Sequence, residues 1–353
     1  MRETLKGTDK RALKNPTHYI LDQTTESKAE DSFDYAKNSV QVVNVLFFNL
    51  QVSDPEVIKD MFDMKKAQIN RPEIVKGCTY NWSGNLMILV KTDDSWRAKR
   101  KAIAHTFFKN QLIAMLDKLK HYTMEAQKRW LEEIRASKDG STKINMTTEV
   151  LKIQQNFLMH IVFGKNVEAI SVKIQNTDPK SEQKFFEQNL GEANETLAMQ
   201  QLQGIYTRIL NPLWRFGWNY FGQSWAFTSG EKVADVNALN YRAAVRDYIQ
   251  KFKSGEVKSD LADDSDMMSQ MLKAPHIYSD EDIIDEVVDF LTAGTMTLLY
   301  SQQCALWHMC IDKKSLGRIR AEFDGCVKRA GSYEAAFKDE LTYDKLRDMT
   351  YVS

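Results

Sequence analysis

Proline and glycine are scarce in this sequence, which has 6 prolines and 15 glycines among 353 residues. Because both residues interrupt helices, their scarcity favours a mainly α-helical fold. The sequence also lacks an excess of charge of either sign. Lys and Arg together number 48, as do Asp and Glu, so the formal net charge is zero. Nucleic-acid-binding domains carry a basic surplus, so we expect no nucleic-acid partner.

Cysteine is rare as well, with Cys78, Cys304, Cys310 and Cys326 as the only four. No two of them form a CxxC pair, and no Cys or His lies at zinc-finger spacing, so we assign no metal ligand. We expect free thiols in the protein core, including Cys304 and Cys310. The standard phosphate-binding, nucleophile-elbow and HExxH signatures are also missing, which excludes the common motif-defined hydrolases and nucleotide-binding enzymes.

Long hydrophobic runs are lacking too. The most apolar stretch, residues 40–52, is too short for a membrane span and contains Gln and Asn. Its β-branched and aromatic residues predict one or two strands. Residues 1–38 form a polar leader, and Ser53-Asp54-Pro55 predicts the start of a helix after the strands. We therefore expect a small sheet region at residues 40–75, followed by a helical region at residues 76–353.

The clearest helical segment covers residues 279–311. Ser279 is a good N-cap, and Asp282 lies where its carboxylate can reach back to the cap amide. Apolar residues then follow at helical spacing, first on one side and later on several. This pattern predicts a long helix that passes through the interior of the protein.

The middle of this segment reads Ala293-Gly294-Thr295-Met296-Thr297. Glycine costs about 1 kcal/mol in a helix interior. The hydroxyl of Thr297 can bond the carbonyl of Ala293, four residues back. One interpretation is a bend that opens a groove for a flat cofactor or small ligand. The other is close packing of a second helix against Gly294.

A second segment of interest is the helix predicted from residue 94 or 95 through residue 116. Trp96, Arg100, Ile103 and Phe107 share one face of it. A tryptophan N–H and an arginine side chain on one face suit a carboxylate or phosphate. The alternative is a buried tryptophan beside an arginine that extends to solvent. The neighbouring basic residues are interpreted either as a docking face for an acidic partner or as a solvated surface.

The remaining pattern predicts further helices and two loops. Residues 214–227 are rich in aromatic side chains that could contact a membrane interface, roof a pocket or pack in the core. We expect loops at residues 71–94 and 170–182. Helices are expected at residues 111–136, 146–163, 184–209, 231–253, 267–272 and 314–328, with another beginning at residue 341.

The order of these segments resembles the cytochrome P450 family from about residue 40 to the last residue. The strand is followed by SDPEVIKDMF, SWRAKRKAIAHTFF, FGKN, DEVVDFLTAGTMT, LGRIRAEFD and LTYDKLRDMTYVS, in the order found in that family. Trp96 and Arg100 match its W-x-x-x-R motif, which binds a haem propionate. Ala293, Gly294 and Thr297 match its A-G-x-[DE]-T motif, which borders the oxygen site.

Three departures qualify the resemblance. The family's E-x-x-R and cysteine-ligand segments are not found, so the chain is expected to be an incomplete P450 domain, inactive on its own. None of the four cysteines has the ligand-loop context. Met296 stands where the family usually has an acid, which puts proton transfer through that position in question.

The resemblance implies a function as part of a longer chain. We expect a haem-thiolate monooxygenase that inserts one oxygen atom from O2 into an apolar organic substrate, with electrons from NAD(P)H delivered by a reductase. Thr297 would act at the oxygen site, while Trp96, Arg100, Ala293 and Gly294 would contact haem. A peripheral membrane contact is also implied, at the endoplasmic reticulum if a eukaryotic full-length chain carries the usual anchor. The alternative is a non-catalytic helical binding or scaffold protein derived from a P450.

Overall fold

The structure is a computed structural model that describes residues 40–44, 49–52, 59, 73–165, 170–178, 180–261 and 264–349. The chain forms two compact units, Met1–Ile69 and Asn70–Ser353. In the first unit, β1 (Val40–Asn44) pairs with antiparallel β2 (Asn49–Val52). This hairpin confirms the predicted small sheet. The helix predicted after Ser53 falls almost entirely outside the described residues.

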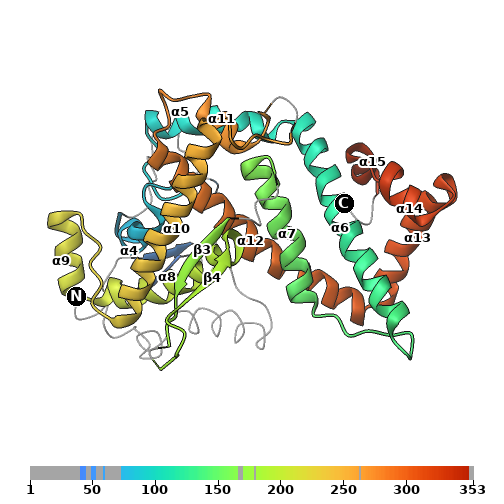
Figure 1. Cartoon of the computed structure of the whole chain (residues 1–353), viewed down its shortest axis with the longest axis horizontal. Helices are drawn as coiled ribbons and strands as arrows, with labels where there is room; N and C mark the ends of the chain where they lie inside the picture. Colours follow the sequence, from blue (N-terminus) through green and yellow to red (C-terminus); the bar gives the residue numbers. More distant parts are fainter. Residues whose placement is uncertain are drawn as a thin grey trace. The chain divides into compact units, whose positions relative to one another are not determined.

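The second unit is mainly helical, which confirms the predicted fold class (Figure 1). None of the described helices is long and apolar enough to cross a membrane. Its helical elements are α4 (Glu73–Ser83), α5 (Asp94–Ile103), η2 (Ala104–Phe107), α6 (Lys109–Ala136), α7 (Met146–Phe163), α8 (Leu190–Leu210), α9 (Pro212–Phe221), α10 (Ser229–Lys253), α11 (Met267–Leu272), α12 (Asp280–Ile311), α13 (Lys313–Ala330), α14 (Tyr333–Ala335), η4 (Ala336–Glu340) and α15 (Tyr343–Asp348).

Helix α12 starts where the sequence predicted. The amide of Ser279 donates to the Asp282 carboxylate at 2.9 Å, and the Asp282 amide donates to the Ser279 hydroxyl at 3.2 Å. This reciprocal capping satisfies two amides that would otherwise have no helical acceptor. The helix packs along α7 and also contacts α8, α10 and α4, then continues to α13 (Figure 1).

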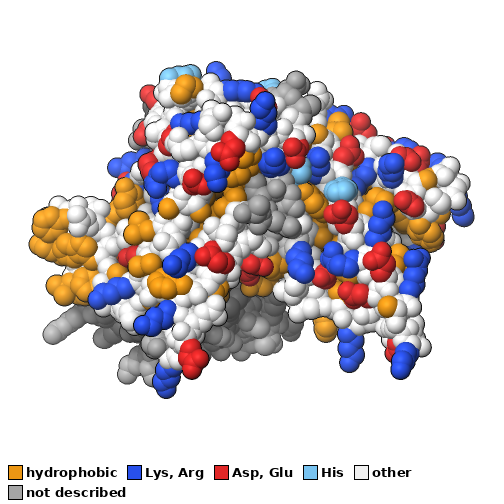
Figure 2. Space-filling view, viewed as in Figure 1, with side chains coloured by type: hydrophobic (Ala, Val, Ile, Leu, Met, Phe, Trp, Pro, Cys, Tyr) orange, Lys and Arg blue, Asp and Glu red, His pale blue; other side chains and the backbone are white. Residues whose placement is uncertain are grey.

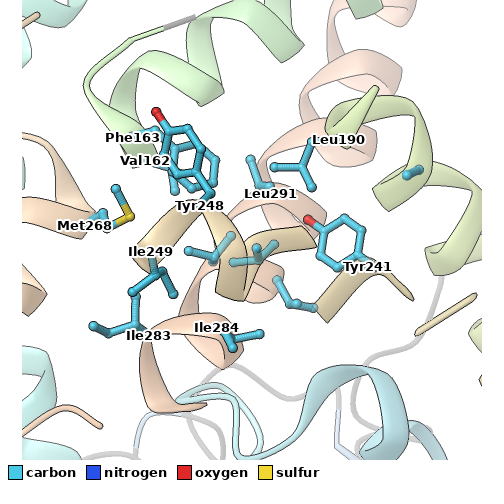
Figure 3. Close-up of a cluster of buried hydrophobic side chains, with 14 of the residues drawn as sticks. Val162, Phe163, Leu190, Tyr241, Tyr248, Ile249, Met268, Ile283, Ile284 and Leu291 are labelled. Atoms are coloured by element: carbon cyan, nitrogen blue, oxygen red, sulfur yellow. The ribbon is translucent and has the colours of Figure 1, made fainter. Parts of the chain in front are cut away.

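The core of the second unit gathers around the first half of α12. Six consecutive residues, 283–288, are buried there, and Leu291 follows one turn later. Figure 3 shows Ile283, Ile284 and Leu291 among side chains from α7, α8, α10 and α11. Burial around the whole circumference of the helix requires partners on every side, and these four helices provide them.

Two predicted loops contain regular structure instead. Residues 171–189 form an antiparallel hairpin of β3 (Ser171–Gln175) and β4 (Phe185–Asn189). Strand β3 replaces part of the polar linker expected at residues 170–182, and β4 replaces the start of the helix expected at residues 184–209, which begins only at Leu190. In β3, Val172 and Ile174 are buried between exposed polar residues, so alternation over only five residues was enough to form a strand. Helix α4 occupies part of the loop expected at residues 71–94. Its sequence has a weak helix propensity, which tertiary packing overrides.

The helix predicted from residue 95 through residue 116 is interrupted. Helix α5 ends at Ile103, η2 follows, and Phe108 adopts an extended conformation before α6 begins at Lys109. The exposed rings of Phe107 and Phe108 mark this turn. The interruption has no proline or glycine, so no local signal in the sequence announced it.

The expectation of buried thiols was wrong for two of the four cysteines. Cys78 and Cys326 are buried, but Cys304 and Cys310 are exposed on the second half of α12. That half also exposes large apolar side chains, so α12 passes through the core only along its first half. The exposed apolar residues are Leu298, Tyr300, Trp307 and Ile311.

Two arginines attach helix α4 to the rest of the unit. Arg208 of α8 donates to the carbonyl of Cys78 at 2.5 Å and pairs with Asp235 at 3.0 Å. Arg242 of α10 donates to the carbonyl of Trp82 at 3.1 Å and pairs with Asp285 of α12 at 2.7 Å. Both guanidinium groups are largely buried, so α4 is bound through ion-paired donors that water hardly reaches.

Candidate cofactor-binding site

An open hollow of about 460 Å³ lies between α5, η2, the loop before α5 and helix α12. Its walls are mostly apolar, and its one charged lining residue is Arg100. The face predicted for residues 96–107 is confirmed, since all four of its members line the hollow. The complete lining is Met87, Ile88, Trp96, Arg100, Ile103, Ala104, Phe107 and Phe290.

Helix α5 presents Trp96 and Arg100 to this hollow. The side chain of Asp93 caps the helix by accepting from the Trp96 amide at 2.9 Å. The Trp96 indole N–H donates to the Met87 carbonyl at 3.1 Å, which fixes the ring against the preceding loop. The Arg100 guanidinium lies 5.2 Å from the centre of that ring. Within the described part of the chain, the Arg100 side chain forms no hydrogen bond or ion pair.

The two predicted donors therefore differ in this structure. Trp96 has already given its N–H to the protein, so it acts as a platform that orients the arginine. Arg100 lies at the edge of an apolar hollow, and none of the described residues accepts a hydrogen bond from its guanidinium. Such an arginine can bind a carboxylate with two parallel hydrogen bonds. The rest of the hollow offers apolar contact to the body of the same molecule.

A charged cluster lies just behind the hollow, where α5 meets α12. Lys99 is buried and forms a short ion pair with Asp282, and its carbonyl accepts from the Tyr278 hydroxyl at 2.7 Å. Burial alone would raise the pKa of Asp282. The hydrogen bonds from Lys99 and Ser279 outweigh burial and hold that pKa below its ordinary value.

Glu286 is the unexpected member of this region. It is fully buried, and within the described residues neither carboxyl oxygen forms a hydrogen bond of good geometry, although a weak contact with the Met87 amide lowers its pKa slightly. Burial, with a smaller contribution from Asp289, raises its pKa to about 8, although nearby Lys99 opposes the shift. At neutral pH its side chain is thus mainly the uncharged acid. The sequence carried no signal for this, because an acid in an amphipathic helix is usually exposed.

Helix α12 borders the hollow through Phe290, whose ring stacks on Phe107 with centroids 5.7 Å apart. Ala293 and Thr297 follow at spacings of three and four residues, so they continue the same face. Both are exposed, and the Thr297 hydroxyl donates to the Ala293 carbonyl at 2.5 Å, which confirms the predicted bond. An exposed strip of small side chains therefore extends from the hollow along α12.

Gly294 lies at the border of this strip and makes the close helix contact that the sequence left open. A Cβ atom at this position would lie 2.6 Å from Cδ2 of Leu158 in α7. The space beside Gly294 is thus occupied by Leu158, and α12 continues unbroken to Ile311. The hollow reaches Phe290 of α12, but Gly294 and Thr297 are not part of its lining.

Taken together, these features define a mainly helical protein with an open, mostly apolar hollow that is lined by one arginine. The sequence profile of the cytochrome P450 family matches residues 49–353, so the chain belongs to this family. Its fold is similar to the crystal structure of a cytochrome P450, CYP102L1, with a TM-score of 0.60 and 14% sequence identity. The alignment covers 93% of this chain but 66% of that one. A comparison with curated proteins gave no match.

Proposed function

We propose that the chain provides the haem-facing helices of a haem-thiolate monooxygenase that inserts one oxygen atom from O2 into an apolar organic substrate. The observation that carries the proposal is Arg100, whose guanidinium lies at the edge of an apolar hollow and has no hydrogen-bond or ion-pair partner among the described residues. Haem is a planar, largely apolar cofactor with two carboxylate-bearing side chains, so this hollow suits one edge of it. Family membership and fold support the same cofactor.

Each site residue has a proposed role toward haem. Arg100 binds a propionate. The Trp96 ring lies under the guanidinium of Arg100 and holds it in place. Ala293 and Gly294 supply a helix surface with no bulky side chain, against which a flat group can lie. When bound, haem supplies the redox chemistry by which oxygen is activated. Thr297 holds a hydroxyl on the same face, available to donate or accept at the oxygen site once it leaves the Ala293 carbonyl.

The proposed substrate is a small apolar organic molecule, and the proposed electron source is NAD(P)H acting through a reductase. An acidic partner would meet basic side chains of α5 and the start of α6. Arg97 and Lys101 are exposed there, and Lys109 pairs with Asp344 at 2.8 Å. Surface charges of this kind speed and orient association more than they strengthen it.

Haem titration of paired variants tests the cofactor proposal. In Arg100→Leu, loss of the propionate partner should weaken haem affinity about tenfold or more, the effect of losing one hydrogen bond to a charged group. Arg97→Leu is the matched control. Arg97 lies on the same helix and pairs with Asp94 at 2.7 Å, and it does not line the hollow. The measurements are haem absorbance and quenching of tryptophan fluorescence. Equal affinity in both variants would show that Arg100 does not bind the cofactor.

The alternative function is a non-catalytic helical binding or scaffold protein. Two observations favour it: Leu158 fills the space beside Gly294, and the Trp96 indole is already bonded to Met87. A scaffold predicts that haem associates without saturation and that neither arginine variant changes this. Saturable binding of one haem per chain that depends on Arg100 would exclude it.

We also propose a peripheral membrane contact through α9. Figure 2 shows hydrophobic side chains gathered over this helix. Trp214 and Trp218 stack with centroids 6.4 Å apart on its protein side, while Phe216, Tyr220 and Phe221 are exposed. The aromatic run thus divides between core packing and a solvent-facing surface. Exposed aromatic side chains on one face of a helix suit the interface of a bilayer.

Vesicle binding tests this contact. The double variant Phe216→Ser and Phe221→Ser should partition into phosphatidylcholine vesicles about tenfold less. Each change removes an aromatic ring from the exposed face that would contact the bilayer. Leu239→Ser is the control, since Leu239 on α10 is 64% exposed and lies outside the aromatic helix. An unchanged partition of the double variant would overturn the proposal. A localisation at the endoplasmic reticulum remains part of this proposal for a eukaryotic full-length protein.

A further inference from the structure

The loop between α4 and α5 connects helix α12 to the candidate site. This loop, residues 84–93, contributes Met87 to the lining of the hollow. Leu86 beside it is buried, and its carbonyl accepts from the amides of Leu89 and Val90 at 2.9 and 3.2 Å. Because this part of the loop is a tight turn on a packed core, a displacement at Met87 is transmitted to its neighbours.

Asp285 of α12 binds the start of the loop. Its side chain accepts from the Asn85 amide at 2.8 Å and pairs with Arg242 of α10 at 2.7 Å. Gly84 has a positive φ of 57°, and a Cβ atom there would overlap the carboxylate of Asp285. Glycine is therefore required for this close approach of the loop to α12.

Glu286, the next residue of α12, touches the same loop. It is fully buried, and its carboxyl makes a weak contact with the Met87 amide. The Met87 carbonyl in turn accepts from the Trp96 indole N–H at 3.1 Å. The Trp96 ring lies 5.2 Å from the Arg100 guanidinium. One chain of contacts thus runs from Glu286 through Met87 and Trp96 to Arg100.

The protonation state of Glu286 affects the first of these contacts. Burial, the largest cause, raises the pKa of Glu286 to about 8. The titratable and charged groups that interact with it are Lys99 of α5, Tyr278 before α12, and Asp285 and Asp289 of α12. A carboxylate accepts a shorter and stronger hydrogen bond than the neutral acid does. Loss of the proton to water therefore strengthens the attraction between Glu286 and the Met87 amide.

We infer that Glu286 is a positioning residue for the candidate site, because its ionisation draws Met87 toward α12 and so displaces Trp96 and Arg100. In the neutral form Met87 fixes the indole, and the ring holds the arginine at the hollow. Ionisation disturbs this arrangement, so Arg100 binds a carboxylate less tightly. The inference rests on the proposed function only where it names haem, because the link from Glu286 to Trp96 requires no cofactor.

Nuclear magnetic resonance of the full chain without haem, with isotopically labelled tryptophan, tests the link. The indole N–H resonance of Trp96 should shift with a midpoint of about pH 8, and Glu286→Gln should abolish this shift. The indole of Trp130 is the internal control. It donates to Glu149, whose pKa is held below its ordinary value by hydrogen bonds from Trp130 and Arg129 despite burial, so it should not titrate there.

A matched variant on the same helix separates the link from a general change in α12. Asp280 lies in the first turn and pairs with Lys253, so Asp280→Asn should leave the titration of the Trp96 indole unchanged. A constant Trp96 resonance in the parent, or a titration that persists in Glu286→Gln, would overturn the inference.

Haem titration shows whether the link reaches Arg100. In the parent, haem affinity should be about threefold lower above pH 8 than at pH 7 relative to Glu286→Gln, the effect of weakening one hydrogen bond. This difference should vanish in an Arg100→Leu background, because the two residues act through one chain of contacts. A difference that persists there would show that Glu286 does not act through the arginine. If haem does not bind saturably, the proposed function fails, whereas the Trp96 titration still decides the link.

Discussion

The two halves of α12 differ although they form one continuous helix. From Asp280 to Leu291 the helix is capped, ion-paired and buried among neighbouring helices. From Gly294 to Ile311 only Thr295 and Leu299 are buried, and large apolar side chains face solvent. Apolar composition alone therefore does not determine burial in this helix. The first half is held by specific partners, whereas the second half exposes apolar side chains to solvent.

The strongest test of this contrast is Asp285→Ala. Asp285 is 4% exposed in its side chain, pairs with Arg242 and accepts from the Asn85 amide at 2.8 Å. Its loss leaves a buried guanidinium with one partner fewer, which should destabilise the fold by about 3–5 kcal/mol. Urea unfolding measures this. The matched change in the second half, Ser301→Ala, should cost little, and equal effects of the two would contradict the contrast.

The next largest effect is expected from truncating a leucine in each half. Leu291 is 1% exposed, so Leu291→Ala should cost about 3 kcal/mol through lost burial and the remaining cavity. Leu298 is 41% exposed, so Leu298→Ala should change the free energy of unfolding by about 0.5 kcal/mol or less. Thermal and urea unfolding of both variants provide the measurement. A large loss in Leu298→Ala would show that the second half also packs tightly.

These two halves also show what the sequence could predict. The bounds of α12 followed from local chemistry, because Ser279 and Asp282 are a recognisable capping pair. The face of Trp96, Arg100, Ile103 and Phe107 followed from helical spacing. The different burial of the two halves did not follow. It depends on contacts between segments far apart in the sequence. The first half has six acidic residues and apolar residues on one side, whereas the second half has apolar residues on several sides, so the sequence favoured burial of the second half.

The same limit applies to the candidate site. The residues of the hollow on α5 were predicted by periodicity, whereas Met87 and Phe290 were not, because only folding brings them to α5. The bond from Trp96 to Met87 and the packing of Leu158 on Gly294 are also tertiary facts. The short β3–β4 hairpin was missed because five alternating residues are a weak signal beside polar neighbours.

A pH-dependent prediction sharpens the contrast within the first half of α12. Glu286 has a folded-state pKa of about 8, against an ordinary value of 4.5. Between these values the folded protein keeps a proton that the unfolded chain has lost, so stability falls as pH rises through this window. Glu286→Gln mimics the protonated form and should become more stable than the parent by up to about 5 kcal/mol above pH 8, with little difference near pH 4. Urea unfolding across this range tests it, and a constant difference at all pH values would contradict the assigned protonation.

The smallest stability effect belongs to Thr297 in the second half. Its hydroxyl bonds only its own helix and its side chain is exposed, so Thr297→Ala should change the free energy of unfolding by about 0.5 kcal/mol or less. In a haem-loaded protein supplied with a reductase, the alanine variant should convert several-fold less of the consumed NAD(P)H into product. Thr297→Ser should keep most of the parent yield because it keeps the hydroxyl. Equal yields from alanine and threonine would make Thr297 a packing residue.

The two arginines that attach α4 have a consequence for ionic strength. Dissolved salt screens charges that are surrounded by water. The screening length is about 8 Å at physiological salt concentration. Exposed pairs between α10 and α12, such as Arg246 with Glu281, lie in that regime. Arg208 and Arg242, with side chains 1% and 12% exposed, are shielded from mobile ions. Raising salt should therefore weaken the exposed ion pairs between α10 and α12, whereas the amide hydrogens of α4 should exchange no faster than at low salt.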